Sequence, residues 1–307
     1  MPHVSGLHHV TILSSSAVGS DRLFRDVLGL TRVKRTVNPD RPDSYHLFYG
    51  DAAGRPGTLV TVHPFANLPQ GMIGVGEIAE PAFAVTPGAP QEWIPHLRGA
   101  GFAVEPPVRA FDRNRIVFDG PGGERLALQV EPRDGRDAQP KPFGGRAGLR
   151  GLHSVLVRVR DGDAVGAMLE RLGFQPLATE ENVTRYSVGA GAAGGGLVDV
   201  ASVPDGPAAV QGAGSVHHLA FSVPGRSELD DVLRTLRESG HEATEVAERT
   251  GFESFFFRGP EGLLFEVATA TANLREPGAA DDNLELPPEL EGDRASIEAR
   301  LEPLDPM

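Results

Sequence analysis

Apolar and polar positions follow the same order four times along residues 1–270. Each repeat begins with a short apolar strand, continues into an amphipathic helix, and ends in alternating segments separated by turns. The predicted opening strands are LHHVTIL, EPAFAV, LHSVLVRV and VHHLAFSV. A period of two is typical of strands, and apolar residues at i, i+3 and i+4 are typical of helices. The pattern therefore predicts four βαβββ modules.

Each predicted helix ends at a glycine, and the spacing of the glycines supports an internal repeat. Gly29, Gly101, Gly173 and Gly240 are separated by 72, 72 and 67 residues. A glycine just after a helix adopts the left-handed conformation that ends it. Because one βαβββ module leaves an open sheet edge and an apolar face, it must pair with another. We therefore expect an α+β fold in which four modules form two pairs.

The chain length of 307 residues suggests about two domains. We expect modules 1 and 2 in residues 1–135, a Pro- and Gly-rich linker at 136–149, and modules 3 and 4 in residues 150–270. The remaining residues, 271–307, carry a net charge of −7 out of −13 for the whole chain. This acidic C-terminal tail is either an extended strap with one short helix near residues 293–301 or a disordered segment.

The composition excludes several classes of function. Lys and Arg number 29 against 42 Asp and Glu, and this negative balance disfavours nucleic-acid and anionic-membrane partners. Cysteine is absent, so any metal must be held by His, Asp or Glu. The sequence lacks an apolar run of about 18 residues and a signal-peptide pattern, which predicts a cytoplasmic location without membrane spans.

Histidines and carboxylates fall at repeated positions. Three opening strands carry histidine: His8 and His9, then His153, then His217 and His218. Aligning the closing strands GLLFEVA, GGLVDVA and GTLVTVH places Glu266, Asp199 and Thr61 at equivalent positions. An inward-facing carboxylate in an apolar strand needs a partner to offset its desolvation, and a metal ion would provide one.

The pairing of the modules decides which chemistry these residues support. If modules 1 and 4 pair, the site is His9, His218 and Glu266, a set that suits non-haem Fe(II) and oxygen chemistry. If modules 3 and 4 pair, the site is His153, Asp199, His218 and Glu266. Four protein ligands suit a Lewis-acid enzyme with Zn²⁺ or Ni²⁺ better. Periodicity alone does not choose between the two.

The motifs resemble the vicinal oxygen chelate superfamily, which is built from paired βαβββ modules, and within it the ring-cleaving dioxygenases that act on hydroquinones. The resemblance covers almost the entire chain through LHHVTI, YHLFYGD, LRGLHSVLVRV, VHHLAF, ERTGFESFFFRGPEGLLFEVAT and LPPELEGDRASIEARL. It implies two vicinal oxygen chelate domains. The implied activity is that of an Fe(II)-dependent, extradiol-type dioxygenase that cleaves a hydroquinone or related dihydroxylated aromatic with O₂.

The resemblance also implies roles for individual residues. The metal ligands would be His9, His218 and Glu266, with Fe(II) as the cofactor and Mn(II) in some relatives. The implied catalytic residues are His8 and His217 as acid and base, Arg249 for charge balance on the deprotonated substrate, and Thr11 in the pocket wall. The family has a tyrosine where this chain has Phe256, which bears on the substrate because phenylalanine offers no hydroxyl.

Two alternative functions remain beside the dioxygenase. One is a glyoxalase-like lyase or isomerase that uses His153, Asp199, His218 and Glu266. The other is a non-enzymatic drug-binding protein of the same fold. The expected partners of the leading hypothesis are a small aromatic substrate and O₂, and a homo-oligomer is compatible with the sequence. Of the other histidines, His46 is a secondary site candidate, whereas His63 is predicted to be structural or on the surface.

Overall fold

The computed structural model describes residues 3–39, 41–132, 134–143, 147–189, 195–249, 251–270, 274–275 and 283–304. Its elements confirm the four predicted βαβββ modules. The terminating glycines at the ends of the four module helices all have a positive φ, between 75° and 98°, in agreement with the predicted left-handed stops.

The first two modules span the first half of the chain. Module 1 consists of β1 (Gly6–Ser14), α1 (Ala17–Asp21), the π-helical turn η1 (Arg22–Val27), β2 (Thr31–Asn38), β3 (Arg41–Gly50) and β4 (Leu59–Pro64). Module 2 consists of β5 (Glu77–Val85), α2 (Ala89–Gly99), β6 (Ala103–Val104), β7 (Val108–Ala110), β8 (Arg113–Asp119) and β9 (Arg125–Val130).

The second half repeats this plan. Module 3 consists of β10 (Leu152–Val159), α3 (Gly162–Arg171), β11 (Phe174–Glu180), β12 (Val183–Val188) and β13 (Leu197–Ser202). Module 4 consists of β14 (Val216–Val223), α4 (Arg226–Glu238), β15 (Ala247–Arg249), β16 (Phe252–Arg258), the 3₁₀ turn η2 (Pro260–Gly262) and β17 (Leu264–Thr269). The C-terminal segment adds η3 (Pro288–Asp293) and α5 (Arg294–Glu298).

The two sheets join modules that are distant in sequence. An 8-stranded sheet has the order β15-β16-β17-β14-β1-β4-β3-β2, so it combines modules 1 and 4. A 9-stranded sheet contains β11-β12-β13-β10-β5-β9-β8-β6 with β7 beside β8, so it combines modules 2 and 3. The sheets therefore do not follow the predicted halves 1–135 and 150–270. The reason is that the open edge of β1 pairs antiparallel with β14, and that of β5 pairs with β10.

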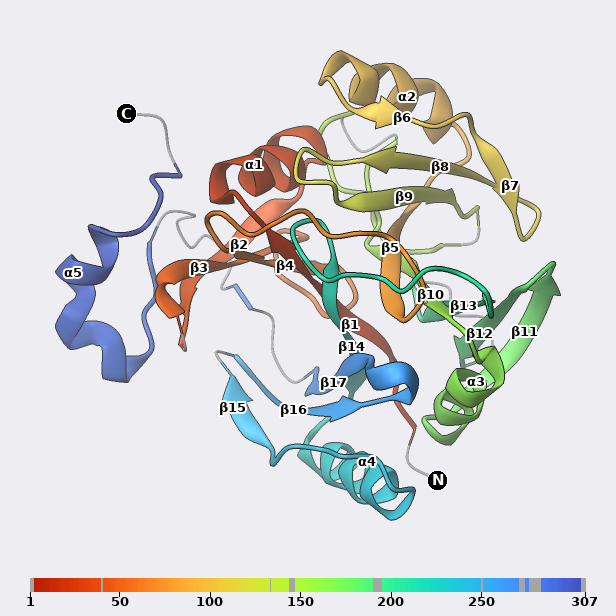
Figure 1. Cartoon of the computed structure of the whole chain (residues 1–307). Helices are drawn as coiled ribbons and strands as arrows, with labels where there is room; N and C mark the ends of the chain where they lie inside the picture. The colour runs from red at the N-terminus through yellow and green to blue at the C-terminus, as the bar shows by residue number, and fades with distance from the viewer. Residues whose placement is uncertain are drawn as a thin grey trace.

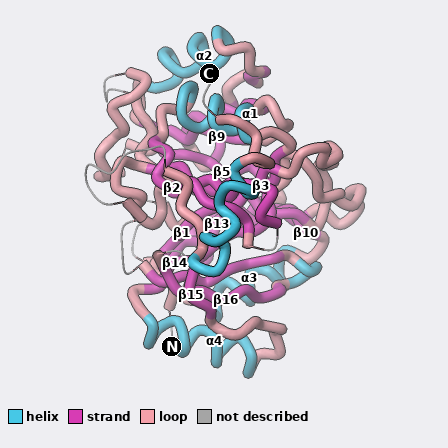
Figure 2. The backbone as a smooth tube through the Cα atoms, turned by 90° about the vertical axis from the view of Figure 1, so that its left-hand side faces the viewer, coloured by secondary structure: helices cyan, strands magenta, loops and turns pink. Residues whose placement is uncertain are grey.

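Strands fill the middle of the molecule and helices lie at its periphery, with α2 and α4 at opposite ends (Figures 1 and 2). One apolar core runs through both sheets, because each sheet buries its apolar face against the module helices and the neighbouring sheet. Phe174 of β11 packs edgewise on Phe221 of β14 across the two sheets, with ring centroids 5.5 Å apart. No helix in the described ranges is long and apolar enough to span a bilayer.

The described part of the acidic tail, residues 283–304, packs along module 1 with its short helix α5 (Figure 1). Leu284 forms a β-bridge with Arg35, and Glu285 pairs with Lys34 at 3.1 Å. Ile297 of α5 is 1% exposed. Near the end of the segment, Glu302 accepts a hydrogen bond from the Ala17 backbone. These contacts fit the strap alternative, and the rest of the tail lies outside the described residues.

Candidate metal centre

The junction of the two strands β1 and β14 positions the candidate ligands. Thr11 of β1 lies opposite His218 of β14, and His9 lies opposite Ala220. Glu266 of β17 is the parallel neighbour of Ala220. Because residues two apart on a strand face the same side of a sheet, His9, His218 and Glu266 gather on one face. The sheet that combines modules 1 and 4 therefore builds the predicted three-residue set.

Three ligand atoms converge on this face. Glu266 Oε2 lies 3.1 Å from His9 Nε2 and 3.1 Å from His218 Nε2, and the two nitrogens are 3.2 Å apart. Ligand atoms about 2.1 Å from one cation and at right angles to each other would lie about 3 Å apart. The observed spacing fits three neighbouring ligands of one metal ion. In the described part of the chain, this is the group of His, Asp and Glu side chains with metal-binding spacing.

Because the three side chains are buried, their protonation states depend on the contacts that they make with one another. Glu266 is only 2% exposed, between apolar neighbours in β17. Burial opposes ionisation of Glu266, but the charge of His9 and the hydrogen bonds from both histidines outweigh it, so its pKa lies well below the ordinary value. Burial lowers the pKa of His218 despite its bond to Glu266. A carboxylate anion facing an imidazole that prefers to be neutral suits metal binding, since a cation replaces the missing protons.

The first histidine of each HH pair contacts the Nδ1 of the ligand histidine that follows it. His8 Nδ1 is 3.0 Å from His9 Nδ1, and His217 Nδ1 is 2.8 Å from His218 Nδ1. Burial, followed by the charge of His9, lowers the pKa of His8 to about 3. Burial, followed by the charge of His218, lowers that of His217 to about 4. Each of these neutral rings therefore hydrogen-bonds the Nδ1 of a ligand histidine, the nitrogen that does not face the metal site. This bond fixes the tautomer and the orientation of the ligand ring.

The hydroxyl of Thr61 lies where a fourth ligand, a second carboxylate, would lie in a symmetric site. Thr61 of β4 is the parallel neighbour of Thr11 on β1, as Glu266 is of Ala220 on β14. Thr61 Oγ1 lies 2.7 Å from Thr11 Oγ1 and 3.1 Å from His46 Nε2. Thr11 Oγ1 in turn lies 2.9 Å from His218 Nε2. Because neutral hydroxyls are weak ligands compared with carboxylates, the set remains at two histidines and one carboxylate.

A cavity of about 640 Å³ opens onto the ligands. Its walls come from modules 1 and 4 and from the C-terminal segment at Leu286 to Glu289. His217 and Arg249 line it as the sequence suggested, whereas His8 and Thr11 contact the ligands without lining it. His63 also lines it, although the sequence offered no signal beyond its position two residues after Thr61 on β4.

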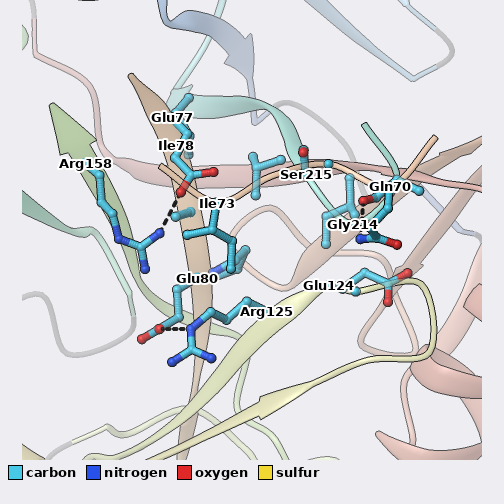
Figure 3. A pocket seen from close by; sticks show the side chains of 17 residues that line it. Gln70, Ile73, Glu77, Ile78, Glu80, Glu124, Arg125, Arg158, Gly214 and Ser215 are labelled. Atoms are coloured by element: carbon cyan, nitrogen blue, oxygen red, sulfur yellow. Dashed lines mark hydrogen bonds and ion pairs between the residues drawn. The ribbon is translucent and has the colours of Figure 1, made fainter. Parts of the chain in front are cut away.

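A smaller cavity of about 30 Å³ lies apart from these ligands (Figure 3). Its wall carries two ion pairs, Arg158 with Glu77 at 2.6 Å and Arg125 with Glu80 at 3.1 Å. Both pairs satisfy their own charges, and the space holds about one water molecule. This cavity therefore offers no comparable site.

The four-ligand alternative is not assembled. His153 and Asp199 belong to β10 and β13 of the 9-stranded sheet, whereas His218 and Glu266 belong to the other sheet. Asp199 is occupied by Arg185, whose Nε and second guanidinium nitrogen donate to its two oxygens at 2.6 and 2.7 Å. The metal-binding set is thus confined to modules 1 and 4.

Comparisons with known proteins agree with this geometry. The sequence model of the "Glyoxalase/Bleomycin resistance protein/Dioxygenase superfamily" matches residues 151–267. The chain is 32% identical over 302 residues to the "Putative ring-cleaving dioxygenase MhqE" of Bacillus subtilis, covering 95% of this chain and 96% of the relative. It is 29% identical to the "Chlorohydroquinone/hydroquinone 1,2-dioxygenase" of Sphingobium indicum, covering 94% and 93%. A crystal structure titled "putative dioxygenase", also from Bacillus subtilis, superimposes with a TM-score of 0.92 at 28% identity and covers 99% of both chains.

Proposed function

Because the chain belongs to the glyoxalase/bleomycin resistance protein/dioxygenase superfamily, and relatives that match almost all of it are named as ring-cleaving or hydroquinone dioxygenases, we propose that it is an Fe(II) enzyme that opens a hydroquinone ring with O₂. The observation that carries this proposal is the cluster of His9, His218 and Glu266, with Thr61 at the fourth position. Two histidines and one carboxylate leave metal positions free for substrate and O₂.

The three-ligand donor set supports an open Fe(II) site in preference to a metal site closed by four protein ligands. Fe(II), when bound, would lower the pKa of a substrate hydroxyl and provide a route for electrons from the ring to O₂. His9, His218 and Glu266 would hold it, and His8 and His217 would keep both imidazoles aligned. Mn(II) accepts similar ligands, so the test below compares both metals.

The remaining cavity residues would manage protons and charge. His217 lines the cavity as a neutral imidazole whose Nδ1 accepts from His218 Nδ1, so its Nε2 carries the proton and would donate a hydrogen bond to a substrate oxygen. Arg249 lines the same cavity and would balance the charge of a substrate phenolate. Thr11 keeps its hydroxyl against His218, and His8 would act through His9 because it does not line the cavity. The proposal therefore gives direct contact with substrate to His217 and Arg249.

Aromatic side chains would exclude water from the reacting ring. Phe256 packs edgewise on His218 with ring centroids 5.1 Å apart, and Phe252 lies 5.9 Å from His9 by the same measure. The guanidinium carbon of Arg249 lies 5.4 Å from the centroid of the Phe256 ring. Phe256 thus supplies an apolar surface and a support for Arg249 at the position where the family has a phenol.

Oxygen uptake tests the proposal. Protein purified without oxygen and loaded with Fe(II) or Mn(II) is mixed with methylhydroquinone, chlorohydroquinone or catechol, and ring-opened product is identified by mass spectrometry. We expect uptake that depends on Fe(II) and is lost in His9→Ala, whereas His153→Ala, in the other sheet, behaves like the wild type. Uptake that survives His9→Ala, or metal-loaded protein without ring-opened product, would contradict the proposal.

A further inference from the structure

Two imidazoles stack on the module 1 wall of the cavity. His46 of β3 and His63 of β4 lie with ring centroids 4.0 Å apart and ring planes at 29°. Both line the cavity that contains the ligands. Neither is adjacent in sequence to a ligand, and neither has a role in the function proposed above. Their position in the cavity makes them available to the substrate.

The hydrogen bonds of the two rings differ. His46 uses its Nε2 to bond Thr61 Oγ1 at 3.1 Å, and its ring also lies on Phe48 at a centroid distance of 4.2 Å. His63 Nδ1 is buried and has no hydrogen-bond partner among the described residues. An orphaned buried N–H is rarer than an under-satisfied acceptor, which favours the tautomer with the proton on Nε2. His63 Nε2 is therefore a donor available to a molecule in the cavity, whereas His46 Nε2 is already hydrogen-bonded to Thr61.

Both rings are neutral near pH 7. Burial, and then the charge of His218, lowers the pKa of His63 to about 3. Burial, and then the charge of His63, lowers the pKa of His46 well below its ordinary value. A bound metal cation would favour the neutral forms further. A neutral imidazole can donate to a hydroxyl without drawing a counter-ion into the cavity.

The opposite wall lacks this pair. The neighbours Phe48 and Thr61 on module 1 correspond in strand register to Phe256 and Glu266 on module 4. Two residues further along these strands, His46 and His63 correspond to Ser254 and Ala268. The cavity is therefore polar and uncharged on the module 1 side, and a substrate that binds between the walls meets unlike surfaces.

We propose that His63 Nε2 hydrogen-bonds the substrate oxygen that is not held at the metal, and thereby selects dihydroxylated aromatics and fixes which ring carbons face O₂. His46 is a positioning residue that supports the His63 ring by stacking. This inference rests on the proposed function, because it takes one substrate oxygen to be held at the metal site. It makes His63 the specificity-determining residue of the cavity, on the wall facing Phe256.

Anaerobic calorimetry separates this role from catalysis. Hydroquinone and 4-methylphenol, which lacks the second oxygen, are titrated into Fe(II)-loaded protein. We expect the wild type to bind hydroquinone about ten-fold or more tightly than 4-methylphenol, as one buried hydrogen bond allows. His63→Phe keeps an aromatic ring but loses the donor, so the preference should fall to about two-fold or less. His63→Gln retains an N–H donor and should recover part of it.

The controls make each outcome decisive. His153→Phe changes a buried histidine of the other sheet and should keep the wild-type preference, and the iron content of every variant is measured. A wild type without preference, or a His63→Phe protein that keeps it, would show the inference to be wrong. A preference lost in His63→Phe but without oxygen uptake by the wild type would support His63 as the binding group and overturn the proposed dioxygenase function.

Discussion

The two sheets have the same module plan but use a buried carboxylate in different ways. In the 8-stranded sheet, Glu266 is the neighbour of Ala220, two residues after His218. In the 9-stranded sheet, Asp199 is the neighbour of Leu156, two residues after Ser154. The first arrangement places an imidazole beside the carboxylate. The second places a hydroxyl there, and the metal-binding set is lost.

In the 9-stranded sheet, the guanidinium of Arg185 occupies the position that the Phe256 ring has beside Glu266 in the 8-stranded sheet. Arg185 lies opposite Asp199 in the register where Phe256 lies opposite Glu266. It neutralises Asp199 through two hydrogen bonds, and Arg115 neutralises Glu80 in the same sheet. A buried carboxylate needs a partner in either sheet. The comparison shows that the partner decides whether the position can accept a cation or is already filled by one.

The largest expected effect comes from isosteric changes of the two carboxylates. Glu266→Gln removes the anionic ligand, so the affinity of the protein for iron should fall at least about 100-fold. Asp199→Asn should retain one iron per chain, because Asp199 contacts Arg185 and no ligand set. Metal analysis after dialysis measures both proteins. Loss of iron from Asp199→Asn alone would reverse the roles assigned to the two sheets.

The second effect concerns stability in the 9-stranded sheet. Arg185→Phe imitates the other sheet but leaves Asp199 buried without its partner, which should lower the free energy of unfolding by about 3–5 kcal/mol. Adding Asp199→Val removes the stranded charge and should restore most of this loss. Urea unfolding measures both variants beside the wild type. Equal stability of Arg185→Phe and wild type would mean that the pair contributes little to folding.

The sequence predicted the fold because its signals were local and repeated. Strand alternation and the four helix-ending glycines, such as Gly29 and Gly101, report on single modules and were confirmed. Which modules pair is a long-range property, since the edge of β1 is equally open to β5 and β14 in sequence terms. The consecutive halves 1–135 and 150–270 followed from chain order alone, and the sheets cross them.

The same limit applied to the site. The repeated positions gave His9, His218 and Glu266 as one of two possible sets, and the resemblance of the HH pairs and LFEVAT to known motifs chose between them. The structure brings these side chains together. His63 was missed because a lone histidine on a strand has no signal until the facing wall is known. His153 was grouped with the ligands in the four-ligand alternative. The strand register makes His153 equivalent to His217, and the position equivalent to the ligand His218 is occupied by Ser154.

The smallest of the three expected effects concerns His8, which contacts the Nδ1 of the ligand His9. If His9 binds metal through Nε2, its Nδ1 carries a proton and donates to His8 Nδ1 at 3.0 Å. His8→Phe leaves that donor buried without an acceptor, so iron affinity should fall about 10–100-fold. His8→Asn offers an amide oxygen and should recover part of the loss.

The matched change in the other sheet is His153→Phe. His153 is the register equivalent of His217; it is buried, whereas His217 is half-buried, and its neighbour at the ligand position is Ser154. Its Nδ1 has no hydrogen-bond partner in the described ranges. The substitution should therefore leave iron affinity within about two-fold of wild type, since no ligand depends on it. Titration of metal-free protein with Fe(II) under nitrogen compares the three variants. Equal losses in His8→Phe and His153→Phe would mean that general packing, rather than orientation of His9, sets the affinity.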